Sequence, residues 1–133
     1  MRQEELTNRA VELLKHLIAT PSVSRNEAQA ANVMEQAIRE LGFEPRREAN
    51  NVWTIDPHFD ERRPTLLLNA HIDTVKPVAT WTRNPYYPQQ EDDTLYGLGS
   101  NDCGGGLVSL LQVYAWLTAR EQSYNLVYLA SAE

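Results

Sequence analysis

The sequence predicts an α/β domain built around a layered sheet. Helical and strand-like segments alternate along the chain, and two nearly continuous apolar runs, residues 65–70 and 125–130, lie on either side of a helical segment. Such runs are typical of strands that are buried on both faces, as in a sheet covered by helices. The order helix, helix, strand, strand, strand, helix, strand therefore favours an α/β layered sheet.

The first two elements are predicted to be amphipathic helices. Apolar residues recur at three- and four-residue spacing over residues 6–18, and Thr20-Pro21 ends this helix. Ser24 and Glu27 are spaced as a capping box, in which Ser24 caps the backbone of the next helix and Glu27 reaches back. We expect this second helix to end at Gly42 in the left-handed conformation.

The remaining elements are shorter. Strands are expected at residues 43–47 and 51–55, and a helix at residues 107–117, where leucine and tyrosine recur at helical spacing. Residues 72–99 lack clear periodicity. Long irregular segments in compact domains are usually functional, and this one joins two chemical motifs, so we expect a functional loop.

Composition limits the functional classes. The chain has 133 residues, 42% of them hydrophobic and 23% charged, which is typical of a globular chain with one core. Its 12 basic and 18 acidic residues give a net charge of −6, which argues against binding to nucleic acid or to an anionic membrane. No segment reaches the roughly 18 apolar residues of a membrane helix. The single cysteine, Cys103, excludes an internal disulfide, and the N-terminus does not resemble a signal peptide, so we expect a cytoplasmic protein.

The first chemical motif is His71-Ile72-Asp73, at the carboxyl end of the first apolar run. Ligands of open α/β sheets bind at that edge. Residues two apart on a strand share a face, so His71 and Asp73 can lie side by side. A metal-bound imidazole commonly gives its other N–H to a carboxylate, which fixes its tautomer. The alternative, a purely structural histidine at a strand end, stays open.

The second motif is glycine-rich, with five glycines and Asp102 in residues 97–106. A glycine-rich segment before a helix can bind phosphate. However, Asp102 occupies the place of the third glycine of the dinucleotide fingerprint, and no Lys-Ser/Thr pair follows as in a P-loop. Because an acid repels phosphate and suits a cation, we interpret Asp102 as a metal ligand.

The second apolar run ends close to another acid, Glu133, which is either a solvated carboxylate or part of the same site. Imidazole and carboxylates that meet at one sheet edge suit Zn²⁺ or a similar divalent ion. Two such ions about 3.5–4 Å apart can share a nucleophile and polarise a carbonyl group.

Together these motifs resemble the N-terminal part of the M20 family of metallopeptidases and deacylases over nearly the whole chain. The matching positions are residues 20–24, residues 71–75, Trp81, Pro85, Tyr86 and residues 95–102. The resemblance implies a layered α/β/α sheet of the zinc-dependent exopeptidase type, incomplete in this chain. It also implies that residues 1–133 are the N-terminal part of a metal-dependent catalytic domain, a fragment without the dimerisation domain and the C-terminal part.

The resemblance further implies roles for individual residues. His71 ligates one metal ion, Asp102 bridges two Zn²⁺ ions, for which Co²⁺ can substitute, and a cis peptide joins Asp102 to Cys103. Asp73 is the catalytic residue that orients His71. The general base is the residue after Glu133, or Glu133 itself if the alignment shifts by one position. Cys103 is a packing residue or, alternatively, a thiolate ligand or a redox-sensitive group.

Departures from the family pattern point to a divergent branch. Leu98 stands where arginine is usual, and Cys103 follows Asp102 where methionine is common. Residues 96–111 look most like acetylornithine-deacetylase-like proteins. The resemblance thus implies a di-zinc amidohydrolase that removes an N-acyl group from a small-molecule amino acid, with N-acetylornithine in arginine biosynthesis as the first candidate, and a homodimeric full-length enzyme. The alternatives are a succinyl-diaminopimelate desuccinylase, a dipeptidase, or a non-catalytic binding module that kept the fold.

Overall fold

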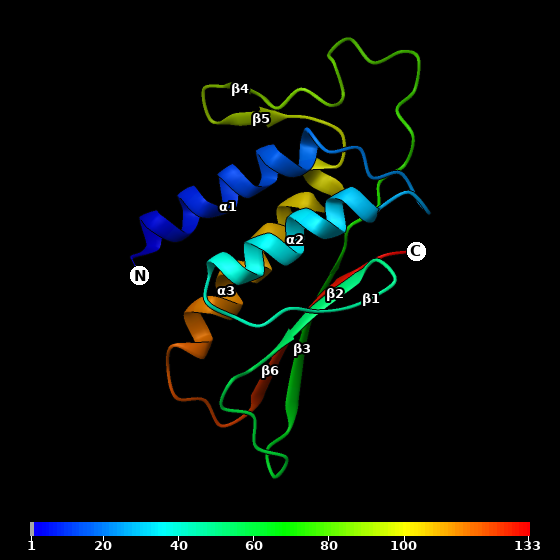
Figure 1. Cartoon of the computed structure of the whole chain (residues 1–133). Helices are drawn as coiled ribbons and strands as arrows, with labels where there is room; N and C mark the ends of the chain where they lie inside the picture. Colours follow the sequence, from blue (N-terminus) through cyan, green and yellow to red (C-terminus); the bar gives the residue numbers. More distant parts are fainter. Residues whose placement is uncertain (1) are drawn as a thin grey trace.

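Two helices pack on one face of a four-stranded sheet, a third helix packs on those two, and a small hairpin lies beyond the end of the sheet (Figure 1). The structure is a computed structural model that describes residues 2–133. The helices are α1 (Gln3–Ile18), α2 (Ala28–Glu40) and α3 (Gly105–Thr118), and a π-helical turn at Ser100–Gly104 precedes α3. The strands are β1 (Arg46–Glu48), β2 (Asn51–Ile55), β3 (Thr65–His71), β4 (Gln89–Glu91), β5 (Thr94–Tyr96) and β6 (Asn125–Ser131). The α/β class predicted from the sequence is confirmed.

Local sequence signals explain the helix ends. The amide of Arg2 donates to the Glu5 carboxylate at 3.2 Å, which satisfies a backbone donor at the start of α1. Gly42 follows α2 with φ at 91°, the left-handed conformation expected there. In the part of the chain that the structure describes, no helix is both long enough and apolar enough to cross a bilayer.

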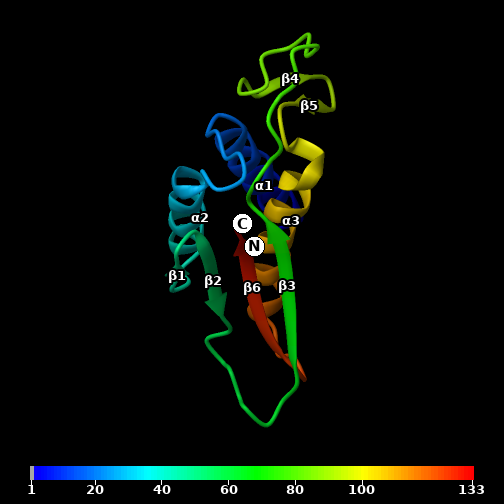
Figure 2. The same ribbon diagram turned by 90° about the vertical axis from the view of Figure 1, so that its right-hand side faces the viewer.

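The main sheet has the strand order β1-β2-β6-β3 (Figure 2). β6 lies between an antiparallel neighbour, β2, and a parallel neighbour, β3. In the parallel pair His71 is aligned with Ser131, so β3 and β6 end at the same edge of the sheet. This register brings the residues that follow the two strands together.

The core lies between the helices and the sheet. The buried residues alternate along β6, as expected for a strand with one face on the core. Tyr128 joins the two layers because its buried hydroxyl donates to the carbonyl of Leu107 in α3 at 2.7 Å, and burial raises the pKa of Tyr128 well above its ordinary value. The core residues are Ala30, Ala31, Met34, Ile38, Val52, Ile72, Leu107, Leu111, Tyr114, Leu126, Tyr128 and Ala130.

The expectation that β3 is buried on both faces is wrong for this chain. Leu66 and Leu67 are 44% and 52% exposed. β3 is an edge strand paired only with β6 among the described residues, and the helices cover only one face of the sheet. The continuous apolar run of residues 65–70 therefore forms a strand whose second face is exposed.

The predicted capping box is also wrong. Helix α2 begins at Ala28, and no side chain caps its N-terminus. The Ser24 hydroxyl instead donates to the Asp73 carboxylate at 3.0 Å, and Glu27 is fully buried. The spacing of Ser24 and Glu27 predicts a contact within the helix start, whereas in the structure Ser24 bonds Asp73 and Glu27 bonds Glu133.

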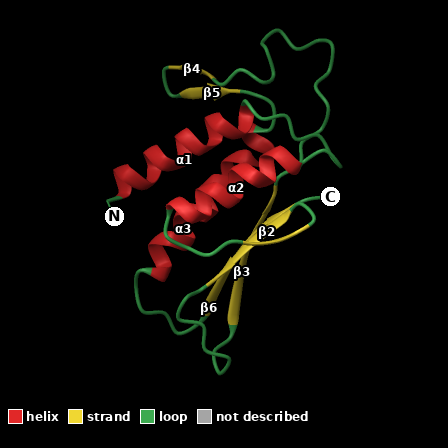
Figure 3. Ribbon diagram, in the orientation of Figure 1, coloured by secondary structure: helices red, strands yellow, loops and turns green. Residues whose placement is uncertain are grey.

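Residues 72–99 contain more regular structure than the sequence predicts. Strands β4 and β5 form an antiparallel hairpin within the loop that follows β3 (Figure 3). Its three-residue strands have too few alternating positions to show periodicity. The Arg83 guanidinium stabilises the hairpin by pairing with the Glu91 carboxylate at 3.0 Å and lying 3.7 Å from the Tyr96 ring centre. The strand expected at residues 43–47 is shifted to β1.

Candidate metal centre

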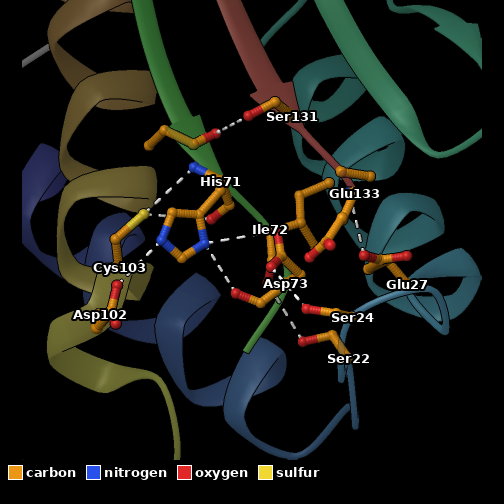
Figure 4. A network of polar contacts seen from close by, with 12 residues as sticks. Ser22, Ser24, Glu27, His71, Ile72, Asp73, Asp102, Cys103, Ser131 and Glu133 are labelled. Atoms are coloured by element: carbon orange, nitrogen blue, oxygen red, sulfur yellow. Dashed lines mark hydrogen bonds and ion pairs between the residues drawn. The ribbon is translucent and has the colours of Figure 1, made fainter. Parts of the chain in front are cut away.

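The candidate site lies where β3 and β6 end (Figure 4). The amide of Ile72 donates to the Ser131 carbonyl at 2.7 Å and extends the pairing of the two strands by one residue. Carboxyl ends of parallel strands are the usual location of ligand sites in α/β sheets. His71 is the last residue of β3, so its side chain is positioned by the sheet itself.

The imidazole of His71 makes one polar contact through each ring nitrogen. Nε2 lies 3.0 Å from Oδ1 of Asp102, and Nδ1 lies 2.8 Å from the main-chain carbonyl oxygen of Asp73. Because a carbonyl oxygen can only accept, Nδ1 carries a proton. In neutral His71 the lone pair of Nε2 then faces a carboxylate oxygen. Such an arrangement requires a cation between the two atoms, either a proton or a metal ion.

Asp73 contributes mainly through its backbone. Its carboxylate Oδ1 is 3.6 Å from Nδ1 of His71, beyond normal hydrogen-bond distance, and its Oδ2 accepts the Ser24 hydroxyl. The main-chain carbonyl of Asp73 is therefore the group that fixes the tautomer of His71. A backbone carbonyl is one of the usual partners for a metal-ligating histidine.

Asp102 lies in the turn that leads into α3, where its own backbone and that of Cys103 are not helical. The amide of Gly104 donates to the Gly99 carbonyl at 2.7 Å and closes this turn, and the Asp102–Cys103 peptide bond is cis. Only glycine fits at two positions: Gly99 has φ at 79°, and a Cβ atom on Gly104 would lie 2.6 Å from the Gly99 carbonyl oxygen. The glycine-rich sequence thus presents the Asp102 carboxylate, 82% exposed, next to His71.

Cys103 holds this turn against the edge of β3. Its Sγ accepts the amide of His71 at 3.2 Å, and its S–H donates to the carbonyl of His71 at 3.3 Å. Burial raises the pKa of Cys103, and the Asp102 and Asp73 charges raise it further, although the His71 amide opposes this. Both hydrogen bonds of the thiol go to the backbone of His71. The thiol satisfies backbone groups that an edge strand would otherwise leave unpaired.

Glu133 follows β6 at the same edge. Its amide donates to Oε1 of Glu27 at 3.2 Å, and its side chain is exposed. The structure therefore brings His71 and Asp102 into contact, places Asp73 beside them, and connects Glu133 to Glu27 instead.

The donors present fit a divalent cation. Two ligand atoms of a tetrahedral zinc ion lie about 3.3 Å apart when each is about 2.0–2.2 Å from the metal, close to the 3.0 Å between Nε2 and Oδ1. Among residues 2–133, no three His, Cys, Asp or Glu side chains form a group that could hold a metal ion. The described chain thus supplies two ligands, fewer than the three that catalytic zinc sites take from protein.

Ser24, which donates to Asp73, and Cys103, which bonds the backbone of His71, adjoin the His71–Asp102 pair, whereas Glu27 bonds the segment after β6. The sequence predicts a helix-capping role for Ser24 and Glu27, and a packing, metal-binding or redox role for Cys103. The motif at residues 20–24 lies next to the end of β3, where Ser22 and Ser24 bond the residues that follow the strand. No local pattern in the sequence indicates that Glu27 and Glu133 meet.

Comparisons with known proteins identify the family of the chain. A sequence model of "Peptidase family M20/M25/M40" matches residues 67–133, which include the His71 and Asp102 motifs. The chain is 29% identical over 113 residues to a succinyl-diaminopimelate desuccinylase of Blochmanniella floridana, covering 80% of this chain and 29% of that protein. It is 28% identical over 135 residues to an acetylornithine deacetylase of Edwardsiella ictaluri, covering 92% of this chain and 35% of that protein.

The fold is also that of a solved structure. An M20 family metallo-carboxypeptidase from Sulfolobus solfataricus superposes with a TM-score of 0.77 at 24% identity, covering all of this chain and 31% of that one. The chain thus spans about a third of the length of these proteins. The family match covers half of the chain and contains both chemical motifs, so the chain belongs to peptidase family M20/M25/M40.

Proposed function

We propose that the chain is the N-terminal part of the catalytic domain of a metal-dependent amidohydrolase that removes an N-acyl group from an amino acid. The observation that carries this proposal is the contact between Nε2 of His71 and Oδ1 of Asp102, with Nδ1 already bonded to a carbonyl. The proposal includes two Zn²⁺ ions, replaceable by Co²⁺, and a cytoplasmic, homodimeric full-length enzyme.

Each residue has a defined part in this proposal. A bound divalent ion polarises the acyl carbonyl and lowers the pKa of water. His71 supplies the lone pair of Nε2, and the carbonyl of Asp73 keeps the proton on Nδ1 so that this lone pair stays free. Asp102 supplies negative charge from a rigid turn. An acid that follows β6, either Glu133 or the next residue, takes a proton from water and passes it to the leaving amine.

Two substrates are favoured by the relatives. N-acetylornithine is the first candidate because residues 96–111 resemble acetylornithine-deacetylase-like proteins and a relative carries that name. N-succinyl-diaminopimelate is the second because a relative of similar identity carries the name desuccinylase. The two acyl groups differ by a carboxylate, so a succinyl substrate needs an additional cationic partner in the full-length enzyme.

The decisive test is to assay the full-length protein, loaded with Zn²⁺, against a panel of N-acetyl amino acids, N-succinyl-diaminopimelate and dipeptides. We expect hydrolysis of an N-acyl amino acid, loss of activity with a chelator, and recovery with Zn²⁺ or Co²⁺. Cleavage of dipeptides alone would replace the deacylase assignment with a dipeptidase. Binding of these compounds without cleavage of any of them would instead identify a non-catalytic module.

For residues 1–133 alone we predict weak zinc binding and no turnover, because the described chain offers two ligands. Calorimetric titration with Zn²⁺ should show micromolar or weaker affinity, and no member of the panel should be cleaved. The His71→Ala variant is the matched control, since it should abolish the weak binding. Tight binding of two ions to this chain would contradict the prediction.

A further inference from the structure

The loop between α1 and α2 touches both strand ends that form the candidate site. On one side the amide of Thr74 donates to the Ser22 carbonyl at 2.8 Å, and the amide of Ser24 donates to the Thr74 carbonyl at 3.2 Å. The Ser22 hydroxyl also donates to the Ile72 carbonyl at 3.3 Å. Through these bonds the segment after β3 pairs in parallel with the loop, and Val23 lies opposite Thr74.

On the other side the same loop holds the chain after β6 through Glu27. Oε1 of Glu27 accepts the amide of Arg25 at 3.0 Å and the amide of Glu133 at 3.2 Å. Arg25 has φ at 73°, so the loop adopts a left-handed turn as it enters this arrangement. One carboxylate oxygen therefore links the loop to a residue 106 positions away (Figure 4).

Burial of the Glu27 carboxylate is energetically unfavourable. Glu27 has no exposed surface, and its second oxygen, Oε2, is buried without a hydrogen-bond partner among residues 2–133. Burying a carboxylate costs several kcal/mol unless it is hydrogen-bonded, whereas an apolar residue would pack there at no such cost. Glu27 contacts the segments around the site and none of the groups that would react.

We propose that residues 22–27 position the two halves of the candidate site relative to each other, with Glu27 as the positioning residue for the segment after β6. This inference rests on the proposed function. Ser24 holds the Asp73 carboxylate, and Glu27 holds Glu133, so one loop adds to the β3–β6 pairing in restraining the separation between the His71 pair and the acid that follows β6. A misplacement of about 1 Å can reduce catalysis about 100-fold.

The test compares Glu27→Ala, Glu27→Asp and Glu27→Gln in the full-length enzyme. We expect Glu27→Ala to lower kcat by about 10- to 100-fold, with KM changed less than about threefold, and to weaken zinc affinity about tenfold. Glu27→Asp, whose shorter side chain cannot reach both amides, should behave similarly and serves if the alanine variant does not fold. Glu27→Gln keeps an oxygen that accepts both amides and should restore kcat to within about threefold of the wild type.

Thr54→Val is the matched control for lost stability. Thr54 is buried in β2 and donates to the Glu44 carbonyl at 2.9 Å, so its replacement removes a buried hydrogen bond outside the site. It should lower the free energy of unfolding while leaving kcat and zinc affinity intact. The positioning role alone would be overturned by a folded Glu27→Ala or Glu27→Asp enzyme whose kcat and zinc affinity lie within twofold of those of Thr54→Val. An inactive wild type that binds no metal would overturn the proposed function, and the positioning role with it.

Discussion

Replacing His71 with alanine in the full-length enzyme is expected to remove nearly all hydrolytic activity, even at saturating Zn²⁺. The imidazole is held by the sheet, its Nδ1 is bonded to the Asp73 carbonyl, and its Nε2 faces Asp102. Loss of groups that merely support a metal ligand typically costs 10- to 100-fold in metal affinity or activity. Loss of a ligand itself should therefore exceed about 100-fold in kcat/KM.

The measurement is steady-state hydrolysis of the best panel substrate, together with the metal content of the purified variant. His58→Ala is the matched control, because His58 is an exposed histidine in the turn between β2 and β3. It should keep wild-type activity and metal content. Activity of His71→Ala within a few-fold of the wild type would refute the role of His71 as a ligand.

Replacing Asp102 with alanine should have a comparably large effect for a different reason. The Asp102 carboxylate is the negatively charged group that faces Nε2 of His71, and it is presented by a turn that requires glycine at Gly99 and Gly104. Asp102→Asn keeps the size of the side chain but removes the charge, so it should also lose more than about 100-fold in kcat/KM if Asp102 bridges two metal ions.

The number of bound metal ions distinguishes Asp102→Ala from His71→Ala. A bridging carboxylate contacts both ions, so Asp102→Ala should lose both, whereas His71→Ala should retain part of the metal. Asp93→Asn, which removes an exposed carboxylate from the β4–β5 turn, is the control for a change in net charge and should be fully active. Full metal content and activity in Asp102→Asn would show that the charge is not needed.

The elements best predicted from the sequence are those whose signals are local. Helix α1, the β2 strand and the left-handed Gly42 were anticipated because periodicity and a terminating residue act within one or two turns of chain. The His71 and Asp102 motifs were identified in the same way. The hairpin of β4 and β5 is not predicted from the sequence, because its strands have only three residues each and the Arg83 side chain that stabilises them leaves no periodic pattern.

The errors at Ser24 and Glu27 have a common cause. Both residues satisfy a recognised local pattern, and a hydroxyl near a helix start normally finds its partner nearby. In the folded chain the Ser24 hydroxyl donates to Asp73, 49 residues away. Glu27 still accepts a nearby amide, but its distant partner is Glu133. Spacing alone cannot distinguish a local partner from a distant one.

The sequence by itself determined the α/β class, the helices, the family resemblance and which residue types could bind a cation. The tertiary structure decided which of these residues meet, through the parallel register that aligns His71 with Ser131 and the turn that brings Asp102 to Nε2. It also decided that the Asp73 carbonyl bonds His71, that the Cys103 thiol bonds the backbone of His71, and that the buried Glu27 bonds the Glu133 amide. The reason is that secondary structure follows from neighbours along the chain, whereas hydrogen-bond partners far apart in sequence are chosen only when the layers pack.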